Sequence, residues 1–138
     1  MFDIALPSSW LAFVVALVVT QVLGFLRYSN FFFAKPWMKA IGKTEKQIRS
    51  ATNSTVYIYS VIGAAVMLLI LANVLRWAGI TEPFPAVGVA LAIWLGFVAT
   101  SSAMNTAFEN RGWPLWAIDN GYHMVNAILS AAILTLIK

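Results

Sequence analysis

Two ionisable residues, Asp119 and His123, lie inside an apolar segment of the sequence, residues 115–137, which is long enough to cross a lipid bilayer. A titratable side chain at membrane depth is costly, and those that occur usually face a bundle interior or a water-filled cavity. Histidine changes its charge near neutral pH, and chains of Asp and His recur in proton pumps. We therefore take this pair as the first candidate for a functional site.

The pair belongs to a longer polar stripe on the same segment. Four polar residues follow one another at intervals of four, three and four positions: Asp119, His123, Asn126 and Ser130. Residues with this spacing project from one face of an α-helix. We therefore expect this helix to turn a polar side toward protein or water.

The preceding apolar segment carries a second polar stripe, formed by Ser101 or Ser102, then Asn105, then Glu109. The connection between the two segments is only about residues 110–114. So short a connection predicts a tight antiparallel hairpin of two helices.

Reflection about the centre of this short loop brings Asn105 to the level of Asp119, and Ser101 to the level of His123. We therefore predict that both stripes face the same space. The predicted polar pathway or proton relay consists of six residues: Asp119, His123, Asn126, Asn105, Glu109 and Ser101.

Three roles for Asp119 and His123 remain open from the residues alone: a structural clasp, a proton relay and a metal site. In a structural clasp, the carboxylate and the imidazole satisfy each other, whereas a proton relay would use their titration. With Glu109 one turn further away, the pair makes a thin ligand set for zinc, so we expect no metal and no cofactor. The chain has no cysteine, no glycine-rich phosphate loop and no G-x-S-x-G or H-E-x-x-H motif. We therefore expect no enzymatic activity.

The composition predicts the surroundings of this site. Of the 138 residues, 61% are hydrophobic and 10% are charged, whereas an average soluble domain is roughly a quarter charged. Runs of about 20 apolar residues span a bilayer, and the sequence has four of them: residues 9–26, 56–75, 84–108 and 115–137. We predict one domain over residues 1–138. Its fold class is all-α, an integral membrane four-helix bundle with a short interfacial helix in the first loop.

The first loop mixes aromatic and basic residues, as an interfacial segment does. Thr44 and Gln47 have the spacing of a capping box, which predicts a short surface helix over residues 45–51. Interleaved cations and aromatic residues also occur in nucleic-acid-binding proteins. Here the adjoining spans favour membrane lipids as partners, including anionic headgroups, and we expect no nucleic acid.

The basic residues also predict the orientation. Six of the nine Lys and Arg residues lie between the first two spans: Arg27, Lys35, Lys39, Lys43, Lys46 and Arg49. Short loops rich in Lys and Arg remain in the cytoplasm. We therefore expect a cytoplasmic first loop, with Arg111 on the same side and both termini outside.

Two further features predict helix packing. Gln21 lies within the first span, where an interhelical hydrogen bond is the expected role of an amide. The third span carries a stripe of small residues: Gly88, Ala92, Gly96, Ala99 and Ala103. Such stripes let helix backbones approach closely. We expect this stripe to pack against a helix of the same chain or of another subunit, and we predict a homo-oligomer.

Four ordered motifs cover nearly the whole chain: Gly24-x-x-x-Tyr28-Ser29, Lys35-Pro36-Trp37-Met38-Lys39, Trp94-Leu95-Gly96-Phe97 and Asp119-x-Gly121-Tyr122-His123. With these motifs the sequence resembles small membrane proteins grouped as domain of unknown function 1761. The resemblance implies a compact bundle of about four helices in a bacterial inner membrane. It implies no particular activity.

Together these features favour a small oligomeric transporter or channel-like protein with a proton-sensitive Asp/His site inside the membrane. The alternative is a non-catalytic assembly or accessory subunit in which the pair is only a clasp. A pathway must continue to both surfaces of the membrane, whereas a clasp can be local.

Overall fold

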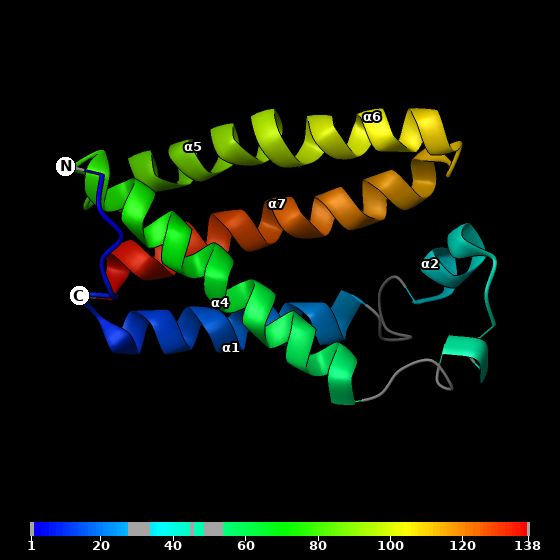
Figure 1. Cartoon of the computed structure of the whole chain (residues 1–138), viewed down its shortest axis with the longest axis horizontal. Coiled ribbons are helices and arrows are strands. Elements are labelled where there is room, and N and C mark those ends of the chain that lie inside the picture. Colours follow the sequence, from blue (N-terminus) through cyan, green and yellow to red (C-terminus); the bar gives the residue numbers. More distant parts are fainter. Residues whose placement is uncertain (1, 28–33, 45, 49–53, 138) are drawn as a thin grey trace.

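The computed structural model describes residues 2–27, 34–44, 46–48 and 54–137, and Figure 1 shows their arrangement. The helices are α1 (Trp10–Arg27), α2 (Ala34–Ile41), α4 (Ser54–Trp77), α5 (Pro83–Ile93), the π-helix η1 (Trp94–Ala99), α6 (Thr100–Glu109) and α7 (Trp113–Leu136). No strand occurs within these described residues. The prediction of an all-α fold is therefore confirmed.

Each of the four apolar runs forms a helix, and α5, η1 and α6 continue one another from Pro83 to Glu109. Proline opens this long helix, since Pro83 stands in its first turn, where a missing backbone N–H costs no helical hydrogen bond. The hairpin to α7 turns through Asn110, which adopts a left-handed conformation, and Gly112, whose φ of 90° favours glycine. Pro114 then follows in the first turn of α7.

Helix α7 is the centre of the bundle and contacts every other helix named above. The α5–η1–α6 helix runs antiparallel to α7, and α4 crosses the bundle diagonally (Figure 1). Both termini lie at one end of the bundle, and α2 lies with the α6–α7 turn at the other end (Figure 1). The two ends therefore differ in which loops they carry.

The apolar core lies near the end that holds the termini. Its fully buried members are small or medium in size and come from α4, α5 and α7: Leu75, Ala86, Ala90 and Ala131. Alanine at the points of contact lets the helix backbones approach closely. Leu71 and Leu134 pack around this cluster and complete it.

Hydrogen bonds attach α1 to the rest of the bundle. The Thr20 hydroxyl donates to Asn126 Oδ1 on α7 at 2.9 Å, and the Tyr122 hydroxyl donates to the Thr20 carbonyl at 3.3 Å. On the other side, the Ser60 hydroxyl of α4 donates to Gln21 Oε1 at 3.2 Å. The predicted interhelical hydrogen bond of Gln21 is therefore confirmed.

The segment before α1 is fastened to the end of α4. The buried Asn73 side chain accepts a hydrogen bond from the Ala5 N–H at 2.8 Å and donates one to the Ala5 carbonyl at 3.0 Å. Arg76 pairs with the Asp3 carboxylate at 3.6 Å, and Trp77 Nε1 donates to the Asp3 carbonyl at 3.0 Å. This segment therefore holds the start of α1 against the end of α4.

The first loop contains a helix, α2, that the sequence did not predict as one. The predicted capping box is confirmed, since the Thr44 N–H donates to Gln47 Oε1 at 2.9 Å and the Gln47 N–H donates to Thr44 Oγ1 at 3.3 Å. Residues 46–48 are helical. The remainder of the predicted surface helix over residues 45–51 lies outside the described residues.

Small residues of the third predicted span are buried on a different face from the one expected. Ala86 and Ala90 pack against α7, whereas Gly88, Ala92 and Gly96 are exposed. A Cβ placed on Gly88 or Gly96 would meet nothing within 4 Å. Among the described residues of the chain, no helix therefore packs closely on Gly88 or Gly96, and Ala92 between them is exposed.

Candidate functional site

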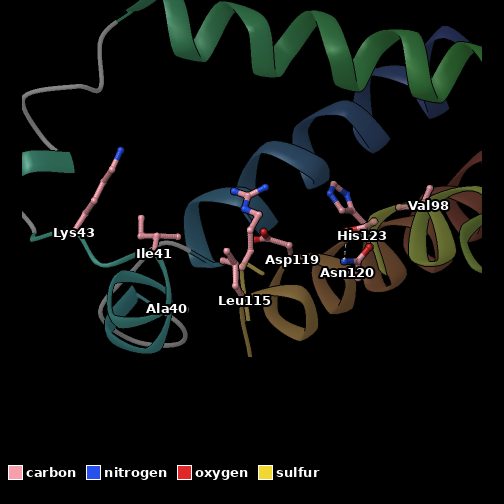
Figure 2. A pocket seen from close by; sticks show the side chains of 10 residues that line it. Ala40, Ile41, Lys43, Val98, Leu115, Asp119, Asn120 and His123 are labelled. Carbon is pink, nitrogen blue, oxygen red and sulfur yellow. Dashed lines mark hydrogen bonds between the residues drawn. The ribbon is translucent and has the colours of Figure 1, made fainter. Parts of the chain in front are cut away.

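An open pocket of about 720 Å³ lies between the α6–α7 hairpin and the region of α2, and Figure 2 shows it from close by. Ten residues line it: Ala40, Ile41, Lys43, Val98, Ser102, Arg111, Leu115, Asp119, Asn120 and His123. Ala40, Ile41 and Lys43 stand on one side, and the α7 residues stand on the other (Figure 2). The pocket therefore joins two regions that are far apart in the sequence.

Asp119 and His123 both belong to the α7 wall of this pocket. They lie one helical turn apart, and both side chains are half-buried. The His123 ring also lies beside the Tyr122 ring, with centroids 5.2 Å apart and the planes tilted by 60°. The pocket therefore gives a carboxylate and an imidazole a shared, open surface.

Asn120, between these two residues, is a site residue that the sequence analysis missed. Its side chain is 2% exposed, and its Nδ2 donates to Ser102 Oγ at 3.0 Å and to the Trp116 carbonyl at 2.9 Å. A carbonyl can only accept, so this contact fixes which end of the amide is the nitrogen. Asn120 therefore links α7 to α6 directly behind the pocket.

Two tryptophan side chains reinforce the same wall. Trp94 Nε1 donates to the Asn120 carbonyl at 3.0 Å, and Trp116 Nε1 donates to the Ala99 carbonyl at 3.2 Å. One indole reaches from η1 to α7 and the other from α7 to η1. These reciprocal bonds hold the helices that position the polar residues of the pocket.

Two basic residues also line the pocket. Lys43 follows α2, and Arg111 lies in the α6–α7 turn. Arg111 also pairs with the exposed Glu109 carboxylate at 3.4 Å, and Glu109 is not among the lining residues. The lining therefore combines two cations with the Asp119 carboxylate and the His123 imidazole.

The predicted stripe on α6 faces away from α7. Ser101, Asn105 and Glu109 are exposed, whereas Ser102 and Thr106 turn inward. The expectation that Asn105 and Ser101 lie opposite Asp119 and His123 is therefore wrong, and Ser102, the alternative to Ser101, faces the pocket instead. The sequence does contain a signal for it: Ser102 and Thr106 are four positions apart, as Ser101 and Asn105 are.

The π-helix η1 changes the angular phase between α5 and α6. At about 100° per residue, nine positions would put Ala90 and Ala99 on opposite sides of a regular α-helix, yet both are buried. The wider hydrogen-bonded turns of a π-helix absorb the difference, as in the Thr100 N–H, which bonds to the Leu95 carbonyl. A uniform helical period therefore assigns the wrong face to α6.

The deeper members of the α7 stripe have different surroundings. Asn126 and Ser130 are 7% and 4% exposed, and Asn126 is bonded to Thr20. Both line a second, largely apolar groove of about 320 Å³ between α4 and α5. Of the six predicted site residues, only Asp119 and His123 line the polar pocket. His123 and Asn126 line the groove. The other three line neither space: Asn105, Glu109 and Ser101.

The fold places the chain in a broad class: it is all-helical among its described residues, and two of its helices, Ser54–Trp77 and Pro83–Glu109, are long and apolar enough to cross a membrane. The family described as Protein of unknown function (DUF1761) matches residues 11–135, and the chain belongs to this family. The resemblance found in the four sequence motifs is therefore confirmed. No curated protein and no solved structure matches the chain.

Proposed function

We propose that the chain is a four-span membrane protein of the transporter or channel class, with a proton-sensitive binding pocket at Asp119 and His123. Exposed apolar surface supports the membrane location. Only 22% of the most apolar stretch of Ser54–Trp77 and 17% of that of Pro83–Glu109 is buried. The core helix of a soluble protein would be mostly buried, and so much exposed apolar surface requires a lipid or protein partner.

The distribution of charge supports the proposed orientation. Lys39, Lys43 and Arg111 belong to the end of the bundle that holds α2 and the α6–α7 turn (Figure 1). Arg76 belongs to the opposite end and pairs there with Asp3. Under the positive-inside rule, the α2 end is cytoplasmic and both termini are outside. We propose that the chain lies in the inner membrane of a bacterial cell with this orientation.

The observation that carries the proposal is the open pocket around Asp119 and His123. A dry clasp would enclose both groups, whereas here a carboxylate and an imidazole line a space large enough for a small solute. The pocket lies at the α2 end, and the polar stripe beyond it is buried at Asn126 and Ser130. One chain thus offers access from one side.

A complete pathway then needs a second element. The exposed stripe of Gly88, Ala92 and Gly96 offers a surface on which another copy of the chain can pack closely. We therefore include a homo-oligomer in the proposal, with the polar pocket of each copy as the point of access. Membrane lipids surround the remaining apolar surface.

The second candidate function, a non-catalytic assembly or accessory subunit, is favoured by the deeper contacts of α7. Asn126 and Tyr122 both bond to Thr20 and fasten α1 to α7. These bonds are structural in any function. In an accessory subunit, Asp119 and His123 would likewise serve only to hold the helices together.

Proton flux into proteoliposomes distinguishes the two candidates. An imposed pH gradient is followed with a trapped pH-sensitive dye, for wild type, Asp119→Asn and His123→Gln. We expect wild type to dissipate the gradient faster than empty liposomes and both variants to lose most of this flux, because Asn and Gln do not titrate. Melting temperatures should stay close to that of wild type, since both side chains are half-buried.

Asn105→Ala is the matched control, because Asn105 is exposed on the outer face of α6. It should retain the flux of wild type. Wild-type flux in both pocket variants would contradict the proposal. Loss of stability in both variants, together with no wild-type flux, would favour the accessory subunit.

A further inference from the structure

We infer that the polar pocket and the neighbouring groove together bind one anionic phospholipid of the surrounding bilayer, with its phosphate in the pocket and one acyl chain in the groove. This inference rests on the proposed function, because it names the ligand of the same pocket and places the chain in a bilayer. It commits to a lipid that reaches the site sideways through the membrane.

The groove has the length and the chemistry of an acyl-chain site. Its lining on α4 extends from Ala64 to Val74, which is about 15 Å of helix and therefore about half of the roughly 30 Å hydrocarbon core. Its surface is almost entirely apolar. Met67 and Ile70 line it and are 51% and 43% exposed. The groove therefore opens toward the position of lipid chains.

The pocket and the groove are continuous. Val98 and His123 line both of them. From His123 the groove follows α7 to Ser130, away from the end that holds Lys43. A molecule that occupies both spaces must be polar at one end and apolar over about 15 Å beyond it, which is the shape of a membrane lipid.

The charges of the pocket favour an anionic headgroup. Among the described lining residues, Lys43 and Arg111 are cations and Asp119 is the only carboxylate, so the lining has one positive charge when His123 is neutral. Glu109 pairs with Arg111 from outside the pocket, and water weakens this exposed ion pair. A phosphodiester carries one negative charge and balances that of the lining. The Arg111 guanidinium has five N–H donors, so its contact with Glu109 leaves others for phosphate oxygens.

Native mass spectrometry of the purified full chain tests the headgroup. Phosphatidylglycerol and phosphatidylcholine with identical acyl chains are titrated separately. We expect phosphatidylglycerol to bind at least about fivefold more tightly, given the usual contribution of one basic residue to anionic lipid binding. The double variant Lys43→Gln with Arg111→Gln should lose this preference, whereas Lys46→Gln, an exposed lysine outside the pocket, should keep it.

A second pair of variants tests the groove. Met67→Trp places a bulky ring in the acyl-chain site and should weaken the binding of both lipids several-fold. Ile62→Trp is the matched control, since Ile62 is 56% exposed on α4 and lies outside the groove, and it should bind both lipids as wild type does. Equal affinity of wild type for the two lipids would overturn the inference.

Two further outcomes would also overturn the inference. If Met67→Trp changed the oligomeric size and left lipid affinity intact, the groove would be a contact between copies of the chain. If Ile62→Trp weakened binding as much as Met67→Trp, the lipids would be adsorbing on the general apolar surface of α4.

Repeating the titration above and below about pH 6.5, the ordinary pKa of histidine, separates this inference from the proposed function. The charged and titratable groups that share the pocket with His123 are Asp119, Lys43 and Arg111, and Tyr122 lies beside its ring. Selective phosphatidylglycerol binding without pH dependence or proton flux would support the lipid site and contradict proton sensitivity. Proton flux without lipid selectivity would support the proposed function and contradict the lipid site.

Discussion

The two halves of α7 carry polar residues on the same face but place them in different surroundings. Asp119 and His123 line an open pocket beside basic residues, whereas Asn126 and Ser130 are buried. The difference comes from the neighbours, because α1 covers the deeper half through Thr20. One polar stripe on a helix can therefore combine an open pocket with a buried structural contact, and spacing alone does not separate the two.

The largest expected contrast between the two halves is in access to water. The chain has no cysteine, so His123→Cys and Ser130→Cys each introduce a single thiol. A water-soluble maleimide should label the first variant rapidly and the second only after unfolding, since labelling requires an accessible thiolate and Ser130 is 4% exposed. Gel-shift labelling rates measure the contrast, and similar rates would mean that the two halves are equally open.

A packing variant compares the two halves in stability. Ala131 is fully buried among α4, α5 and α7, so Ala131→Leu should lower the free energy of unfolding by about 1–3 kcal/mol through overpacking. The same change at the exposed Ala117, in the half beside the pocket, should stay within about 0.5 kcal/mol. Thermal unfolding in detergent gives both values. Equal losses would show that the half beside the pocket is packed as tightly as the core.

A smaller effect is expected from the contact that closes the deeper half. Thr20→Val removes the hydroxyl that donates to Asn126 Oδ1 and should cost about 1 kcal/mol, in the range of interhelical hydrogen bonds in membrane proteins. Thr100→Val is the control, because the exposed Thr100 hydroxyl bonds to the Gly96 carbonyl of its own helix. Denaturant unfolding should rank the two variants, and a larger loss for Thr100→Val would contradict the role given to Thr20.

The long helices could be predicted from the sequence because each one is an apolar run bounded by polar or turn-forming residues, whereas α2 is not such a run and was missed. Helix α4 begins at Ser54 and ends at Trp77, within two residues of the expected bounds. Likewise, Pro83 opens α5, where proline is favourable. The capping box of Thr44 and Gln47 could also be predicted, since its two residues are only three positions apart in the sequence.

The pocket could be predicted only in part. The i, i+4 spacing of Asp119 and His123 identified one wall, because helical periodicity is local information. The opposite wall comes from Ile41 and Lys43, whose position depends on how the first loop returns to the bundle, and no local pattern encodes that return. The face of α6 was wrong because Ser101 with Asn105 and Ser102 with Thr106 have the same spacing, so the local pattern did not decide which pair turns inward.

The π-helix η1 determines which faces the two parts of the long α5–η1–α6 helix turn toward the rest of the molecule. It divides one long helix into two lengths with different angular phase, so that Ala90 faces the apolar core while Ser102 faces the pocket. The six residues from Trp94 to Ala99 therefore set the angle between the part of the helix that packs in the core and the part that lines the pocket. Trp94 and Ala99, the first and last residues of η1, are also the points bonded to α7. The change of phase is thus fixed to α7 at both of its ends.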